Sequence, residues 1–221
     1  MTSEARVQAR KRVEEASATT LAERQALRKR AEAEAGASPV KPLALLQAIA
    51  DLLPKDAVVV EEALSSGTGM RQLIRSDDPQ SFYGLRGGGI GWGLPAAIGV
   101  KLALPERPVV ALIGDGSAMY TIQALWTAAN QNIAVVFVIL NNASYRILKQ
   151  RVQTLRGHAA QSGRYVGMEL DNPAIDFVGM ARSLGIEAGR ARTVAEAVDL
   201  IKAGLARNGP SLVEVAIERA L

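Results

Sequence analysis

The sequence contains no cysteine and only one histidine, His158. The lack of cysteine excludes disulfide frameworks, thiolate metal sites and cysteine nucleophiles, and it favours a cytoplasmic location. A zinc site or a Ser/His/Asp triad would have to rest on the one imidazole, so both are disfavoured. Because His158 lies in a polar stretch, we do not expect it to be catalytic.

Long hydrophobic runs are also absent. The longest ones, such as residues 133–140, are too short to span a bilayer, and the N-terminus has no apolar stretch of the signal-peptide type. We therefore expect neither membrane insertion nor export.

The formal net charge is +4, and many of the basic residues lie in the first thirty positions, interleaved with glutamate. This pattern is typical of a solvated helix face, so we expect no nucleic-acid partner. The alternative is an α/β protein that binds nucleic acid through this basic helix. A steep salt dependence of binding would reveal it.

The chain of 221 residues, 48% hydrophobic, is long enough for one sizeable core with an appendage. Residues 4–35 are rich in Ala, Glu, Arg and Lys and predict a helix with little to bury. Gly36 and the Ser38-Pro39 pair mark its end. We therefore predict a charged helical linker at residues 1–37 and a globular domain at 38–221.

In the globular part, β-rich apolar runs alternate with helical patterns. Helices are expected at residues 43–53, 68–74, 95–104, 121–129, 175–184 and 194–206, with another after Tyr145. Strands are expected at 57–60, 109–113, 134–140, near 186 and at 212–217, and a glycine-rich loop precedes the third helix. Strands such as 135–139 are apolar on both faces. The pattern predicts a doubly wound α/β fold with a mostly parallel sheet and helices on both faces.

Polar residues follow two of these strands. Asp115 comes directly after the strand at 109–113, and Asn142 follows the strand at 134–140. If the strands are neighbours, both side chains leave the same edge of the sheet, where ligands of such folds bind. Carboxylate, amide and main-chain oxygens suit Mg²⁺, which often completes its shell with water and phosphate oxygens.

The residues around Asp115 fit a diphosphate. Gly114 and Gly116 allow close approach of the backbone, and Ser117 is expected to open the next helix with its amides towards an anion. The alternative is that each motif merely joins a strand to a helix or caps one. The pairing of the two motifs favours the metal and diphosphate site.

The sequence resembles the thiamine-diphosphate-dependent enzymes. The run Gly114-Asp115-Gly116-Ser117, followed about two dozen residues later by Asn141-Asn142, matches the signature of that family. The stretches at 87–99 and 117–129 look like benzoylformate decarboxylase and its acetolactate synthase-like relatives. The resemblance covers Val40 to the C-terminus, which corresponds to the diphosphate-binding domain of those enzymes.

The resemblance implies specific roles. Asp115, the Asn142 side chain and the Ser144 main-chain carbonyl would bind Mg²⁺. The diphosphate of thiamine diphosphate would be contacted by Leu64, Ser65, Gly116, Ser117 and Tyr145.

The glycine-rich loop has two further roles by the same resemblance. The Gly88 carbonyl would accept a hydrogen bond from the aminopyrimidine, and Ile90 would force the cofactor into a bent shape that favours formation of its reactive carbanion. The alternatives are that Ile90 is an ordinary core residue and that Ser65 is a helix N-cap.

The glutamate that activates the pyrimidine lies, in this family, on a different domain with no counterpart here. The resemblance therefore predicts no catalytic residue in this half and a partner chain carrying the pyrimidine-binding domain, in a homo- or hetero-oligomer. The 1–37 helix would be the tail of a middle domain, and the chain alone would catalyse little.

The substrate is expected to be a 2-oxo acid, with Ile147, Leu148 and Arg151 lining its pocket. Ile147 and Leu148 suit an apolar side chain, whereas Arg151 suits an anionic group. Decarboxylation, possibly with carboligation, is the leading hypothesis. An acetolactate synthase-like carboligase and a catalytically silent assembly domain are the alternatives.

Overall fold

The computed structural model of the chain describes residues 2–74, 76 and 78–220. The helices and strands, in chain order, are α1 (Ser3–Glu34), α2 (Pro42–Leu52), β1 (Val58–Glu62), α3 (Met70–Leu73), β2 (Phe82–Gly84), α4 (Gly93–Ala103), β3 (Val109–Gly114), α5 (Asp115–Ala118), α6 (Ala124–Asn130), β4 (Val135–Asn141), α7 (Arg146–Thr154), α8 (His158–Ser162), α9 (Phe177–Ser183), β5 (Glu187–Ala191), α10 (Val194–Ala206) and β6 (Ser211–Ala216).

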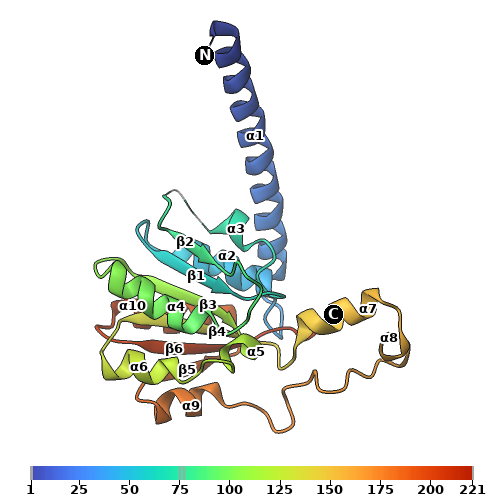
Figure 1. Cartoon of the computed structure of the whole chain (residues 1–221), viewed down its shortest axis with the longest axis vertical. Coiled ribbons are helices and arrows are strands. Elements are labelled where there is room, and N and C mark those ends of the chain that lie inside the picture. The colour runs from blue at the N-terminus through green and yellow to red at the C-terminus, as the bar shows by residue number, and fades with distance from the viewer. Residues whose placement is uncertain (1, 75, 77, 221) are drawn as a thin grey trace.

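The strands form one parallel six-stranded sheet in the order β2-β1-β3-β4-β6-β5 (Figure 1). The chain runs outwards from β1 to β2 and then returns to the other side of β1 with β3. The strand order therefore reverses between β1 and β3, and ligands of open parallel sheets bind beyond the strand ends at such a switch point. This topology places the carboxyl ends of β1, β3 and β4 beside one another.

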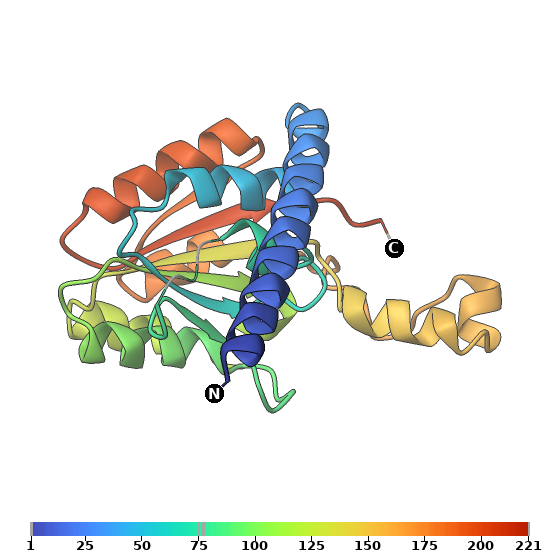
Figure 2. The same cartoon turned by 90° about the horizontal axis from the view of Figure 1, so that it is seen from above.

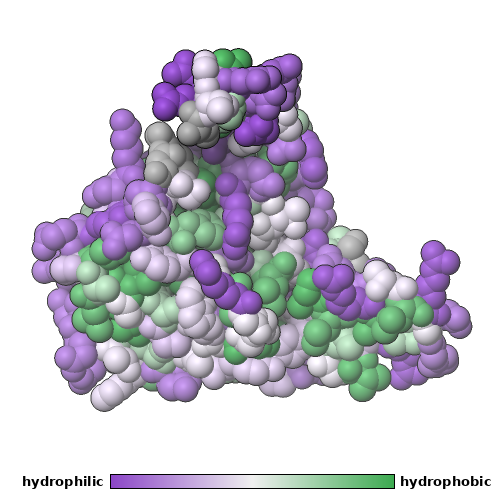
Figure 3. All heavy atoms as spheres, turned by 45° about the horizontal axis from the view of Figure 1, so that its top comes forward, coloured by the Kyte–Doolittle hydropathy of each residue, from purple (hydrophilic) through white to green (hydrophobic). Residues whose placement is uncertain are grey.

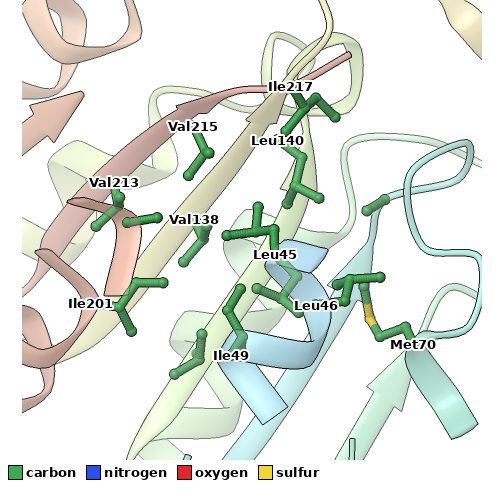
Figure 4. Packing of buried hydrophobic residues seen from close by; sticks show 14 of the residues in the cluster. Leu45, Leu46, Ile49, Met70, Val138, Leu140, Ile201, Val213, Val215 and Ile217 are labelled. Carbon is green, nitrogen blue, oxygen red and sulfur yellow. The ribbon is translucent and has the colours of Figure 1, made fainter. Parts of the chain in front are cut away.

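Each face of the sheet is covered by helices because the central strands are apolar on both sides. Along β4, Val138 and Leu140 pack in a core with α2, α3 and α10 (Figure 4). Phe137 and Ile139 point the other way, into a second core with α4, α6 and α9. This two-sided burial confirms the predicted doubly wound α/β fold.

Helix α1 projects from the globular body for most of its length (Figures 1 and 2). Its last turns contact α2 and α3: Ala31 is buried, Leu27 packs against the core, and the Arg24 guanidinium donates to the Gln72 carbonyl at 2.6 Å. Residues 10–23 are all exposed. Within the described residues, none of the helices is both long and apolar enough for a membrane crossing.

Helices α7 and α8 form an arm that extends away from the body (Figure 2). The chain returning from the arm is tied to its base, since the Tyr145 N–H donates to the Met168 carbonyl at 2.9 Å and the Leu170 N–H to the Ala143 carbonyl at 2.8 Å. The arm therefore begins directly at the loop that follows β4.

The structure corrects several local expectations. The segment expected to be only a glycine-rich loop is preceded by a short edge strand, β2, paired with β1. The helix expected to open at Ser117 begins at Asp115, so that Ser117 lies in its first turn. The helix expected at 68–74 is limited to α3, because Gly69 takes a left-handed conformation at its N-cap.

Candidate functional site

The two polar strand ends lie side by side. Strands β3 and β4 are paired in parallel with Gly114 opposite Leu140. Asp115 and Asn142 each follow directly in the chain, so they leave the same edge of the sheet. The predicted adjacency of the two motifs is confirmed.

Asp115 is the central titratable group of this edge. Its side chain is only 2% exposed, and burial raises the pKa of its carboxyl to about 6, against the opposing effect of nearby backbone N–H groups such as that of Gly116. Its Oδ2 atom is buried and has no hydrogen-bond partner within the described part of the chain. A buried carboxylate oxygen without a partner is costly, and a cation would compensate it.

The loop after β4 is held in a defined shape by its own side chains. Asn142 Oδ1 accepts hydrogen bonds from the Ser144 N–H and hydroxyl, both at 3.0 Å. Asn141 Oδ1 accepts from the Ala143 N–H at 2.9 Å, and its amide donates to buried Glu214 at 2.8 Å. Ala143 has a φ of 53°, a left-handed conformation that this network stabilises. Ligation by Asn142 Oδ1 would replace one of its bonds to Ser144.

A cavity of about 460 Å³ opens at this edge. It is lined by Ala63, Leu64, Ser65, Ser66, Gly88, Ile90, Gly114, Asp115, Gly116, Ser117, Tyr120, Asn142, Ser144, Tyr145, Arg146, Ile147, Leu148 and Gly167. Every residue expected to bind metal, diphosphate or pyrimidine is in this set, together with Ile147 and Leu148. Arg151 is not in this set. The cavity reaches only the first turn of α7, and Arg151 lies beyond that turn and is exposed.

The wall beside Asp115 is formed by an aromatic ring. A Cβ atom on Gly116 would lie 2.7 Å from the Tyr145 ring, so only glycine lets the ring pack against the α5 backbone. Burial, and to a lesser extent the charges of Tyr120 and Asp115, raises the pKa of Tyr145. Its hydroxyl therefore stays protonated and able to donate a hydrogen bond.

Some lining residues were not predicted from the sequence. Tyr120 and Arg146 lie one or a few residues beyond the motifs, where no spacing rule marks them. Glu62 lies outside the lining but is fully buried beneath the glycine-rich loop, where it accepts from Gly91 and Gly93. The one sequence feature that could have pointed to Glu62 is its position near the end of a predicted strand, since that end of β1 also faces the cavity.

The residues present fit a magnesium ion that is shared with a diphosphate. Among the described residues, no group of three His, Asp or Glu side chains is arranged to hold a metal. Asp115 is the one acidic residue among the described residues that line the cavity, so a cation there would have one carboxylate and neutral oxygens, and it would keep positions open for phosphate oxygens. Mg²⁺ prefers such a shell of few carboxylates plus phosphates and water.

Comparison with known proteins agrees with this geometry. Residues 65–215 match the family model described as "Thiamine pyrophosphate enzyme, C-terminal TPP binding domain". The benzoylformate decarboxylase of Pseudomonas aeruginosa is 40% identical over 177 residues, which are 80% of this chain and 32% of that protein. Isozyme 1 of the acetolactate synthase large subunit of Escherichia coli is 27% identical over 181 residues, 81% and 31% of the two chains.

Among solved structures, the thiamine diphosphate-dependent 4-hydroxybenzoylformate decarboxylase of Rhodococcus jostii superposes with a TM-score of 0.77 at 35% identity, over 83% of this chain and 34% of its own. The present chain therefore spans about a third of the length of these relatives. The matched region contains both strand-end motifs and most of the cavity lining. The chain belongs to the thiamine pyrophosphate enzymes, and the part of them that it carries is the C-terminal domain that binds thiamine pyrophosphate, also called thiamine diphosphate.

Proposed function

We propose that the chain binds the diphosphate of thiamine diphosphate through Mg²⁺ at the edge formed by β3 and β4. Asp115, Asn142 and the Ser144 main-chain carbonyl would hold the metal. The diphosphate would be contacted by Leu64, Ser65, Gly116, Ser117 and Tyr145. The observation that carries this proposal is the buried Oδ2 of Asp115, which has no partner within the described chain and points to a missing cation.

The opposite wall of the cavity would take the organic part of the cofactor. Gly88 and Ile90 line it from the glycine-rich loop. In this proposal the Gly88 carbonyl accepts from the aminopyrimidine, and the Ile90 side chain fills the space that an extended cofactor would need. When bound, thiamine diphosphate supplies a nucleophilic carbon for attack on a carbonyl group. The chain's own task is to bind the cofactor, bend it and keep water from it.

We further propose that the complete enzyme acts on 2-oxo acids by decarboxylation, possibly with carboligation. The similarity to proteins named benzoylformate decarboxylase and 4-hydroxybenzoylformate decarboxylase supports this reaction class. Ile147 and Leu148, at the cavity rim, would contact the substrate's apolar side chain. Arg151, further along α7 and outside the cavity lining, would meet an anionic group of the substrate.

The surface around the cavity suits contact with a second domain. Several apolar side chains around the cavity and on the arm are exposed, among them Leu148, Leu155 and Val166, and hydrophobic atoms lie open on the arm at the right of Figure 3. We propose that a pyrimidine-binding domain, which carries the activating glutamate, covers this face in a homo- or hetero-oligomer. The cytoplasmic location expected from the cysteine-free composition stays a prediction.

Calorimetric titration tests the cofactor proposal. Thiamine diphosphate is added with Mg²⁺ to the wild-type chain and to Asp115→Ala. We expect binding by the wild type that requires Mg²⁺, and a loss of at least about tenfold in affinity for the variant, because the only carboxylate of the metal site is removed. Equal affinity for both proteins would refute the proposed site.

The acetolactate synthase-like alternative is supported by the match to the Escherichia coli large subunit. Both activities would use the cofactor site described above, so binding does not separate them. Adding a pyrimidine-binding domain with pyruvate, and in a second reaction with benzoylformate, does: acetolactate from pyruvate indicates a carboligase, and an aldehyde from either substrate indicates a decarboxylase. Metal binding without either product would favour a catalytically silent assembly domain.

A further inference from the structure

The glycine-rich loop, residues 87–92, is fixed at one end and open at its apex. The Gly91 N–H donates to Glu62 Oε1 at 2.6 Å, and its carbonyl accepts from the Thr121 hydroxyl at 2.7 Å. The Gly93 N–H donates to the other Glu62 oxygen. At Gly88 and its neighbouring glycines, by contrast, an added Cβ would meet nothing within 4 Å.

The fixed end is also tightly packed. Gly91 has a φ of 95°, and a Cβ there would lie 2.6 Å from the Tyr120 Cβ. A Cβ on Gly93 would lie 2.4 Å from Ile113 and 2.8 Å from Glu62 Oε2. These contacts leave the backbone little freedom, so the position of Glu62 determines where this end of the loop lies.

Glu62 itself has no other role in the described structure. It is the last residue of β1, its side chain is 0% exposed, and it does not line the cavity. Its two carboxyl oxygens accept from main-chain N–H groups at the end of the loop and at the start of α4. Hydrogen bonds from two N–H groups fix the orientation of a buried carboxyl group. They therefore hold the loop in place against the rigid sheet.

We propose that Glu62 is a positioning residue for the organic half of the cofactor. By fixing Gly91, it fixes the adjacent Ile90 and, through the same loop, the Gly88 carbonyl. Both would then lie in the cavity where a bent thiamine diphosphate requires them. It makes no contribution to the diphosphate half, which is bound across the cavity at Asp115. The inference rests on the proposed function and adds a residue that acts through the loop.

Two ligands separate the halves of the site: inorganic pyrophosphate with Mg²⁺, and thiamine diphosphate with Mg²⁺. Glu62→Gln keeps the size of the side chain but leaves one oxygen, so one of the two N–H groups loses its acceptor. We expect the dissociation constant of thiamine diphosphate to rise by about tenfold or more, and that of pyrophosphate to stay within about twofold. Calorimetry on the 221-residue chain measures both.

Glu61→Gln is the matched control, because Glu61 is the preceding residue of β1 and accepts from Ala63, not from the loop. It should change neither constant. Thr121→Val removes the hydrogen bond to the Gly91 carbonyl. It should likewise weaken binding of thiamine diphosphate but not of pyrophosphate. This second variant keeps the test valid if Glu62→Gln does not fold. In ligand-free protein, the Gly91 and Gly93 amide proton resonances should move upfield in Glu62→Gln.

The outcomes distinguish this inference from the function on which it rests. A wild-type chain that binds neither ligand overturns both. A wild-type chain that binds both ligands, with Glu62→Gln losing both equally or neither, overturns the positioning role alone. A selective loss for thiamine diphosphate, shared by Thr121→Val and absent from Glu61→Gln, supports it.

Discussion

Asp115 is a buried acid whose charge is only partly compensated, by nearby backbone N–H groups. Burial raises the pKa of its carboxyl from 3.8 to about 6. The folded metal-free chain therefore holds the proton more tightly than the unfolded chain does. Its stability falls as the pH rises from about 4 to about 6, and the penalty is fully present above about pH 6. In the proposed function, this cost in stability leaves a carboxylate free to bind a cation.

Asp115→Asn should remove this penalty. At about pH 7.5 and without Mg²⁺, we expect the variant to be more stable than the wild type by about 1–3 kcal/mol, since two pKa units correspond to about 2.7 kcal/mol. The advantage should shrink below about pH 4, where the wild-type carboxyl is protonated in both states. Urea denaturation at the two pH values measures it. A difference that does not depend on pH would show that the carboxyl charge is not the cause.

Glycine at position 116 is required by the ring of Tyr145. Gly116→Ala places a methyl group 2.7 Å from ring carbons, so the ring must move away from the cavity wall. We expect the affinity for thiamine diphosphate with Mg²⁺ to fall by about tenfold or more, measured by calorimetry. Gly99→Ala is the control, because its added Cβ meets nothing within 4 Å on helix α4. It should leave binding unchanged and raise stability by about 0.5–1 kcal/mol.

At the scale of elements, the sequence was informative where the hydrophobic pattern is long. Helix α10 was predicted with the bounds that the structure gives it, and β3 and β4 within one residue. Strand β2 and helix α8 were missed because three to five residues carry too little periodicity to be recognised, and α5 was expected two residues too late. They form through tertiary contacts, as β2 does by pairing with β1.

The residues of the candidate site likewise divide into those that the sequence predicts and those that it does not. Asp115 and Asn142 were predictable because parallel strands present their ends at one edge. Leu64, Gly88 and Ile90 came from the family resemblance alone. Glu62 was missed because its partners are main-chain groups about thirty residues away, which no local pattern reveals. Arg151 also came from the resemblance; it lies outside the cavity lining, and its role stays a prediction.

The capping box of α10 should contribute measurably to stability. The Thr193 side chain accepts from the Glu196 N–H, and the Glu196 side chain accepts from the Thr193 N–H. Thr193→Ala leaves the first turn without its side-chain acceptor, and we expect a loss of about 1 kcal/mol in the free energy of unfolding. Thr193→Ser keeps the hydroxyl and should lose less than half of that. Equal losses would indicate that the methyl group, not the hydroxyl, matters.

The whole molecule is a compact α/β body with two projections that leave it in different directions, α1 and the α7–α8 arm (Figures 1 and 2). The arm begins at the loop that follows β4 and exposes apolar side chains, among them Leu148 at the cavity. Helix α1 is predominantly hydrophilic, as the purple atoms at the top of Figure 3 show. The arm is therefore the projection suited to bury surface against a second domain, whereas most of α1 suits contact with water.

The sequence predicts a boundary between the charged helix and the globular domain at residue 37. In the structure, the last turns of α1 already pack on the domain, so the residues that stabilise it begin before position 37. None of residues 2–20, the described part of this segment, is buried, so we expect removal of residues 1–20 to leave the melting temperature within about 2 °C of that of the full chain. Removal of residues 1–37 also deletes Leu27, buried Ala31 and the Arg24 hydrogen bond to Gln72, which would uncover the core beneath α2 and α3.

For the longer truncation we expect a fall of about 5–15 °C, from the loss of roughly 2–4 kcal/mol of packing in a chain of this size. Leu27→Ala in the full chain isolates the packing contribution and should account for a substantial part of the fall, whereas Leu21→Ala, at an exposed position of the same helix, should have almost no effect. Differential scanning calorimetry on the full chain, the two truncations and the two point variants compares them directly. If the 1–20 truncation were as damaging as the 1–37 truncation, the projecting part of α1 would have to be in contact with the body, contrary to its exposure in the structure.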